Sequence, residues 1–176
     1  MTKSKTRRVI LEDVCDEITV GHVGPMADKY LPEGIPFLRS QNVRPFKFDP
    51  KEIKYVSPEF HAKLKKSALR PNDVVVTRTG ANVGQCCIIT KQLPIANCSD
   101  LVILRASKEL DPHYLMYVLN SPHGRASIGG DLAGAAQPHF NVGSAKRMEV
   151  NLPDLPTQRK IAGILSAYDD LIENNQ

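Results

Sequence analysis

In the segment "VVVTRTGANVG", residues 74–84, the guanidinium of Arg78 follows an apolar run, and a bend with two glycines, Gly80 and Gly84, comes next. Arg78 is flanked by Thr77 and Thr79, and such a group can bind a phosphate, a carboxylate or a base edge. The bend is not a nucleotide-hydrolase phosphate loop, because Gly84 is not followed by Lys and Ser or Thr. It is not a dinucleotide fingerprint either, since no helical pattern follows it. The segment therefore indicates a binding element at a strand end.

The sequence offers no catalytic constellation. His22, His61, His113, His123 and His139 are scattered, without a pair at helical metal-ligand spacing, and no nucleophile elbow is present. Asp49, Glu52 and Lys54 superficially suggest a metal-dependent nuclease, but such a grouping is common by chance, and a solvated hairpin edge explains it as well. We expect no catalytic residue, metal or cofactor, which favours a binding module.

Composition sets the class of protein. The chain has 176 residues, 41% hydrophobic and 24% charged, so one domain with a real core is expected. The net charge of +4 is compatible with nucleic acid without proving it. The basic N-terminus is unlike a signal peptide, no membrane span is predicted, and the four cysteines lack zinc-knuckle or redox spacing. We expect a cytoplasmic protein with reduced, buried thiols.

The elements that must position Arg78 mix helices and strands without regular alternation, which predicts an α+β fold with a mixed, twisted sheet and short helices. The predicted order begins with a short helix at 9–18, a loop at 20–36, a strand and polar turn at 35–43 and a helix capped by Ser57. A hairpin from 74–78 and 84–89 and a strand at 99–106 come next. A helix capped by Asp111, a loop at 127–140 and a strand at 148–153 complete the order.

The last segment predicts a coiled-coil-like helix. Ile161, Ile164, Tyr168 and Leu171 are spaced three, four and three residues apart, as at a and d positions, and Leu165 and Ile172 widen this stripe. An ordinary amphipathic helix that packs on its own domain is the alternative. Because the pattern is still running at Gln176, we expect the start of a longer helix. The predicted domains are 1–150 and 151–176.

Four segments together resemble one half of the DNA specificity subunit of Type I restriction-modification systems. They are "IPFLRSQNV", "NDVVVTRTGANVGQCCII", "QPHFNVG" and "VNLPDLPTQRKIAGILSAYDDLIENN". The resemblance implies a non-catalytic target recognition domain that reads one half of a split site in double-stranded DNA. It also implies a conserved helix that acts as a spacer and docks methyltransferase and restriction subunits, which supply the S-adenosylmethionine and ATP chemistry. Family members have two domains and two helices, so this chain is a half-subunit or a fragment.

On that resemblance, polar groups at strand ends become candidate DNA contacts. Arg78 can donate two hydrogen bonds to guanine, Gly80 and Gly84 permit positive φ and close approach to phosphate, and an internal salt bridge of Arg78 is the alternative. The candidates are Arg39, Gln41, Asn42, Arg44, Lys47, Arg78, Thr79, Gly80, Asn82, Gln137, His139 and Lys146. Residues 44–54 and 121–134 are the expected source of target choice.

Three functions stay open at this point. The first is DNA recognition for a methyltransferase and restriction complex. The second is a small metal-dependent nuclease that uses Asp49 and Glu52. The third is a truncated interaction module that occupies partner subunits, and the helical stripe could also pair with the same helix of a second copy.

Overall fold

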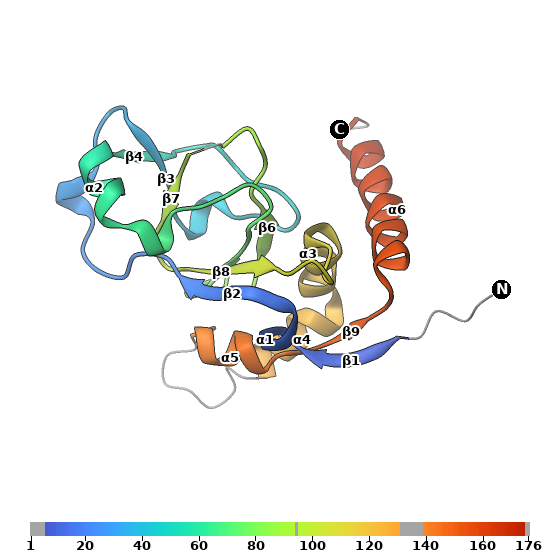
Figure 1. The fold of residues 1–176 in the computed structure, drawn as a ribbon. Helices are drawn as coiled ribbons and strands as arrows, with labels where there is room; N and C mark the ends of the chain where they lie inside the picture. Colours follow the sequence, from blue (N-terminus) through green and yellow to red (C-terminus); the bar gives the residue numbers. More distant parts are fainter. Residues whose placement is uncertain (1–5, 94, 131–138, 175–176) are drawn as a thin grey trace.

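The computed structural model describes residues 6–93, 95–130 and 139–174. Its elements are β1 (Arg7–Ile10), α1 (Leu11–Val14), β2 (Cys15–Val20), β3 (Ile35–Leu38), β4 (Lys54–Val56), α2 (Pro58–Lys63), β5 (Val74–Thr77), β6 (Cys86–Ile88), β7 (Asn97–Cys98), β8 (Leu101–Ala106), α3 (Pro112–Asn120), α4 (Pro122–Gly130), α5 (Val142–Arg147), β9 (Glu149–Leu152) and α6 (Leu155–Asn174), with 3-10 turns at Ala27–Lys29, Ser40–Asn42 and Lys65–Ser67. The predicted α+β class is confirmed (Figure 1).

A four-stranded antiparallel sheet in the order β2-β8-β5-β6 forms the centre of the protein. The valines of β5 alternate between its faces: Val74 and Val76 join the core on one side, and Val75 joins the core on the other. Because both faces are covered, the strand reads as a continuous apolar run and not as an alternating one. The predicted hairpin of β5 and β6 is confirmed.

The two faces have different covers (Figure 1). Helices α1, α3, α4 and α5 contribute side chains to the core on the Val74 face, together with the small β1-β9 ribbon. On the opposite face the core contains Leu38 at the end of β3 and Cys98 of β7. These two strands belong to a second sheet, in the order β4-β3-β7, in which β3 and β7 run parallel. The protein is therefore built in layers around the central sheet.

Local signals explain several helix boundaries. Ser57 caps α2, since its side chain accepts a hydrogen bond of 3.1 Å from Phe60 N, and Pro58 starts the helix. Asp111 caps α3 in the same way, accepting bonds of 3.0 Å from His113 N and Tyr114 N. Both caps were predicted from the sequence, and both are confirmed.

Two predictions of local structure were wrong. The expected helix at 9–18 is a single turn, α1, between two strands, because Leu11 and Val14 turn into the core while β1 and β2 pair with β9 and β8. Residues 127–130 of the expected loop at 127–140 belong to helix α4, and 131–138 lie outside the described residues. Helix α5 was not predicted, since its short sequence "VGSAKR" has no apolar stripe.

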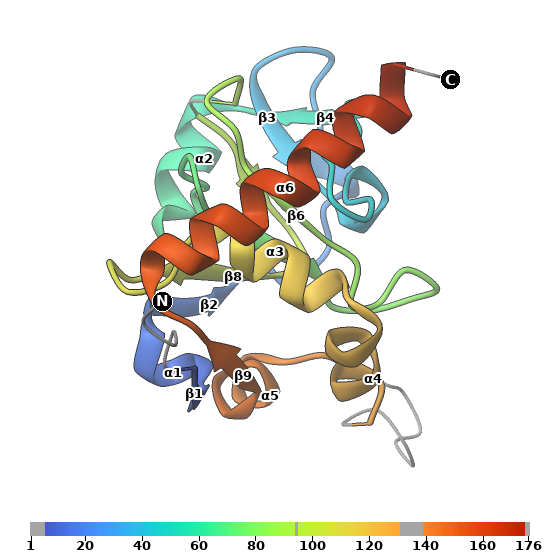
Figure 2. The ribbon, with the colours of Figure 1, turned by 90° about the vertical axis from the view of Figure 1, so that its right-hand side faces the viewer.

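Helix α6 rests on α3 near its start and then runs across the protein surface (Figure 2). Gln158 is fully buried at this joint. Its Oε1 accepts a bond of 2.8 Å from Asp111 N, and its Nε2 donates to Glu109 O at 2.9 Å and Pro153 O at 2.8 Å. Further along, Tyr117 of α3 donates a bond of 2.7 Å to the carboxylate of Asp169. None of the described helices combines the length and apolar content of a membrane span.

The six-residue stripe of α6 is mostly uncovered. Ile161 packs partly against the core, but Ile164 is 49% exposed, Leu165 38%, Tyr168 62%, Leu171 57% and Ile172 57%. The alternative of a helix whose apolar side packs on its own domain therefore applies to the first turns alone. The predicted pairing of this stripe with another helix stays a prediction.

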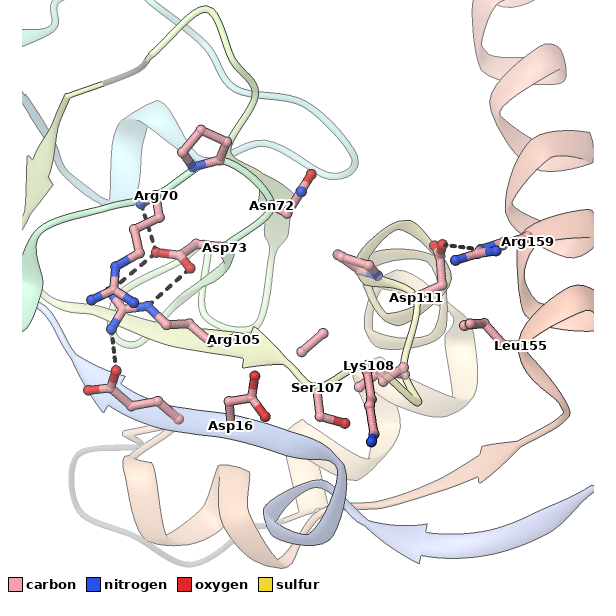
Figure 3. A pocket seen from close by; sticks show the side chains of 15 residues that line it. Asp16, Arg70, Asn72, Asp73, Arg105, Ser107, Lys108, Asp111, Leu155 and Arg159 are labelled. Atoms are coloured by element: carbon pink, nitrogen blue, oxygen red, sulfur yellow. Dashed lines mark hydrogen bonds and ion pairs between the residues drawn. The ribbon is translucent and has the colours of Figure 1, made fainter.

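A buried ionic network ties the two strands β2 and β8 to the segment before β5 (Figure 3). Arg105 on β8 bonds Asp73 through Nε at 3.1 Å, Glu17 on β2 through Nη1, and Ala68 O at 2.8 Å. The side chains of Arg105 and Asp73 are 9% and 4% exposed. They line a cavity of about 500 Å³ that also reaches Asp111 and Arg159 at the joint with α6.

Replacing Asp73 with Ala leaves the Arg105 guanidinium buried without its main counter-charge. We expect a loss of about 3–5 kcal/mol in the free energy of unfolding, measured by urea denaturation. Arg7→Ala is the control, because its pair with Glu109 is more than half exposed on both sides and should contribute less than about 1 kcal/mol. Equal effects of the two substitutions would contradict a structural role for the network.

Candidate nucleic-acid interface

Several strand ends meet at one edge of the molecule. The last residue of β5, Thr77, pairs with the first residue of β8, Leu101, and the end of β2 lies beside the same start. The parallel strands β3 and β7 end together at Leu38 and Cys98, directly before that point. The strand-end cluster consists of the residues that follow or precede these ends, Arg39, Arg78, Ser99 and Asp100, together with Tyr30, whose ring centre lies 5.8 Å from the Arg39 guanidinium carbon.

Arg78 lies at the centre of this cluster. Its Nη1 is 3.4 Å from Asp100 Oδ1, its side chain is 22% exposed, and its Nε is buried without a hydrogen-bond partner among the described residues. Its backbone is fixed on both sides, because its N donates to Asp100 O at 3.3 Å and its O accepts from Phe140 N at 3.0 Å. The internal salt bridge that the sequence left open is present, but it is long and leaves donor capacity on the guanidinium.

Arg39 reaches the cluster from the end of β3. Its guanidinium carbon lies 5.8 Å from the centre of the Tyr30 ring, and its Nη2 donates a bond of 2.6 Å to Glu52 O. Its Nε is also buried without a partner among the residues that the structure describes. Burial raises the pKa of Tyr30, the charge of Arg39 opposes that rise, and the charge of Asp100 adds to it. Tyr30 is thus close to the charges of both Arg39 and Asp100.

The glycine bend has two parts with different roles. Gly80 has φ +80° and Gly84 has φ +79°, so both adopt the left-handed backbone predicted for them. A Cβ on Gly80 would have no atom within 4 Å, whereas a Cβ on Gly84 would meet Ile128 at 3.0 Å and Arg125 at 3.1 Å. Gly80 leaves open space for a ligand, and Gly84 is required for packing against α4. Asn82 accepts a bond of 3.2 Å from Gln85 and lies partly exposed between them.

The loop after Arg39 supplies four further candidates. Gln41 donates a bond of 3.0 Å to Glu52, and Arg44 is 3.3 Å from Asp49 with its side chain 45% exposed. Lys47 is exposed. Asn42 is fully buried, and its amide is used to hold the loop, with bonds of 3.0 Å to Asp49 O and Lys51 O. A DNA contact is therefore not open to Asn42 in this structure.

The tip of this loop is attached to helix α3. Phe46 has the rare φ of +71° for a side chain of its size, its N bonds Cys86 O at 3.0 Å, and its ring lies 5.5 Å from that of Tyr117. Tyr117 in turn bonds Asp169 of α6. Burial raises the pKa of Tyr117, and the hydrogen bond and charge of Asp169 raise it further. The loop with Arg44 and Lys47 is thus linked to α6 through two aromatic rings.

The remaining candidates lie in two places. His139 is exposed and precedes Phe140, whose N bonds Arg78 O, so it lies next to the bend. Lys146 lies on α5 and forms a pair of 2.7 Å with Glu12 on α1, which does not place it in the strand-end cluster. Gln137 is outside the described residues. Thr79 is partly exposed directly beyond Arg78.

Tyr30 and Asp100 were not predicted from the sequence as members of the site. Tyr30 lies in a segment read only as a loop, and Asp100 was treated as the start of a strand. The positive φ of Asp100, +50°, was foreseeable in part, because Asp is one of the few residues that tolerate this region. No sequence signal joins either residue to Arg78, since the link is made by strand pairing.

No group of three or more His, Cys, Asp or Glu side chains within 6–93, 95–130 and 139–174 could hold a metal ion. Asp49 accepts a bond of 3.0 Å from Lys51 N, and Glu52 accepts one from Gln41, so both carboxylates are used within their own loop. Burial raises the pKa of the Cys87 thiol to about 12, so it stays protonated at neutral pH.

Comparison with known protein families gives one match over nearly the whole chain. The model described as the Type I restriction modification DNA specificity domain matches residues 7–176. The chain is 26% identical over 151 residues to the type I restriction enzyme EcoBI specificity subunit of Escherichia coli, which covers 80% of this chain and 30% of that subunit. It is 28% identical over 145 residues to a specificity subunit of Methanocaldococcus jannaschii, covering 79% of this chain and 34% of that protein.

Solved structures agree on the fold. An HsdS subunit from Thermoanaerobacter tengcongensis is similar with a TM-score of 0.68 at 21% identity, covering 99% of this chain and 39% of that one. A chain of a type I R-M system, solved in work on its complex assembly, has a TM-score of 0.71 at 22% identity over 96% of this chain and 39% of its own. The chain spans about a third of the length of the curated relatives.

The two glycines of the bend allow a matched comparison. Gly80→Ala should cost about 1 kcal/mol through left-handed backbone strain alone. Gly84→Ala has the same strain and also presses on Ile128, so it should cost at least about 1 kcal/mol more. Thermal and urea unfolding of both variants would measure the difference. An equal loss would contradict the packing role of Gly84.

Proposed function

Because the chain belongs to the family of Type I restriction modification DNA specificity domains, we propose that it is a target recognition domain that binds one half of a bipartite site in double-stranded DNA. The observation that carries this proposal is the strand-end cluster. Two arginines emerge there from the ends of β3 and β5, and Arg78, whose side chain is 22% exposed, lies beside the open backbone of Gly80.

The chemistry of these groups suits some of them to phosphate contacts and others to base contacts. Gly80, Thr79 and the exposed cations Arg44 and Lys47 are suited to phosphates, which position the protein on the duplex. Arg78 is suited to a guanine, because a planar guanidinium can donate two parallel bonds to the acceptors of that base. Rigid strand ends favour base reading, since they hold the donor in one orientation. Asn82, His139 and Arg39 complete the proposed surface, with Gln41 at its margin.

We further propose that residues 1–150 form this recognition domain and that 151–176 begin a spacer helix. The exposed stripe of α6 would dock the methyltransferase subunit, pair with a second copy of the helix, or both, and a restriction subunit would join the assembly. Support comes from the 38–62% exposure of five large apolar side chains on one face, a patch that monomers in water tend to avoid. The catalytic steps would belong to these partners.

The other two functions have less support. A nuclease would need Asp49 and Glu52 free to bind a metal, yet both accept hydrogen bonds within their loop. Metal-dependent nicking by the chain alone would favour that function. For an interaction module without DNA binding, retention of partner binding in the absence of DNA binding would be the supporting result.

Arg78→Ala should weaken binding to duplex DNA about tenfold or more, because it removes a base or phosphate contact. The free energy of unfolding should change little, since the Arg78–Asp100 pair is long and partly exposed.

The affinity of the unmodified chain for duplex DNA should also fall roughly tenfold or more between about 50 and about 200 mM salt as counterions are released. Fluorescence anisotropy would measure both effects.

Arg8→Ala is the matched control for charge, because Arg8 is exposed on β1 and pairs with Glu149 away from the cluster. It should leave affinity nearly unchanged. A large loss of stability in Arg78→Ala with unaltered DNA affinity would support a purely structural salt bridge.

Ile164→Asp combined with Leu171→Asp should abolish methyltransferase docking and convert any dimer to a monomer, since it places two carboxylates in the exposed stripe. Gly163→Asp adds a carboxylate to another side of the same helix, where a Cβ has no atom within 4 Å, and should not do so. Co-purification with the methyltransferase subunit and analytical ultracentrifugation would test this. Unchanged docking and oligomeric state in the double variant would contradict the proposal.

A further inference from the structure

The backbone at Asp100 requires a particular kind of residue but not a charge. Asp100 has φ +50° and forms, with Ser99, the two-residue turn between β7 and β8. Its N donates to His22 O at 3.2 Å, and its O accepts from Arg78 N at 3.3 Å. Asn and Gly tolerate this left-handed region as well as Asp does. The turn therefore does not account for the carboxylate.

Stability does not account for the carboxylate either. Its contact with Arg78 is 3.4 Å long and involves one oxygen, and the Asp100 side chain is 48% exposed. An ion pair of this kind contributes little to folding. Among the residues that the structure describes, Arg78 is the one cation paired with it, so acceptor capacity remains on the exposed side of the carboxylate.

The position of Asp100 is costly for a surface that binds DNA. It is the one acidic member of the strand-end cluster, and it pairs with the guanidinium of Arg78. A carboxylate at this point repels phosphate and lowers affinity for any duplex. In the major groove, however, an ionised carboxylate can accept hydrogen bonds only, and the groups that donate there are the exocyclic amino groups of cytosine and adenine.

We infer that Asp100 is a specificity-determining residue whose carboxylate accepts a hydrogen bond from the exocyclic amino group of a base, next to the base that Arg78 contacts. The inference rests on the proposed DNA binding. Arg78 and Asp100 present a donor and an acceptor side by side from two paired strand ends, β5 and β8. Their mutual contact orients both groups before DNA arrives, and the carboxylate rejects sites at which it would face another acceptor.

Asp100→Gly tests this with little change to the turn, because Gly adopts the same left-handed backbone conformation and has no side-chain acceptor. The full chain and the variant would each select duplexes from a randomised pool. The unmodified chain should prefer cytosine or adenine at one position, and the variant should lose that preference by about tenfold while keeping the others. Its affinity for unrelated duplex should rise. Asp13→Asn, which removes an exposed carboxylate on α1 at the other end of β2, should do neither.

A second measurement separates base contact from a structural role. The selected duplex would be made with the cytosine or adenine replaced by an analogue that lacks the amino group. The unmodified chain should lose about tenfold in affinity for this duplex, and Asp100→Gly should lose none. Equal losses in both proteins, or an unchanged preference in the variant, would overturn the inference alone. If the unmodified chain selects no sequence, the proposed function fails and the inference fails with it.

Discussion

The turn at Ser99 and Asp100 is the constraint on which the rest of the structure depends. The chain passes there from the β4-β3-β7 sheet into the central sheet. Ser99 N donates a hydrogen bond to Leu38 O, Asp100 N donates to His22 O, and Asp100 O accepts from Arg78 N. Its left-handed residue lets β8 start beside the ends of β2 and β5. This turn brings the ends of β3 and β5 close together, so that Arg39 and Arg78, which are 39 positions apart in the sequence, lie on one surface.

The loop after Arg39 is connected to α6 through the side chains of Phe46 and Tyr117. The loop with Arg44 and Lys47 is attached to β6 by the backbone of Phe46, whose ring lies against Tyr117, and Tyr117 bonds Asp169. The strain at Phe46, a bulky residue with φ +71°, is compensated by these contacts. A displacement of the loop would therefore be transmitted to α6 through the contacts of Phe46 with Tyr117 and of Tyr117 with Asp169.

Much of the fold could be predicted because its signals are local. The caps Ser57 and Asp111, the glycine bend and the apolar run of β5 each depend on a few neighbouring residues. The error at 9–18 arose because apolar spacing there satisfies a helix, whereas strand pairing with β8 and β9 decides the structure.

The candidate site could be predicted only in part. Arg78 and Gly80 were predicted as DNA contacts from their place after an apolar run, and this stays a prediction, whereas the structural role of Asn42 was not predicted. Its amide looks free in the sequence, yet it is buried and holds the backbone of residues 49 and 51. Tyr30 and Asp100 depend on which strands lie side by side, and no short-range pattern carries that information.

The seat of α6 has a consequence for how such chains can diversify. Gln158 holds the helix through main-chain atoms of residues 109, 111 and 153, and none of these bonds depends on a neighbouring side chain. Bonds to the main chain of this kind can form with other side chains at positions 109, 111 and 153. Substitutions at these three positions would therefore leave the bonds that hold the start of α6 in place, as long as residue 111 keeps its main-chain N–H.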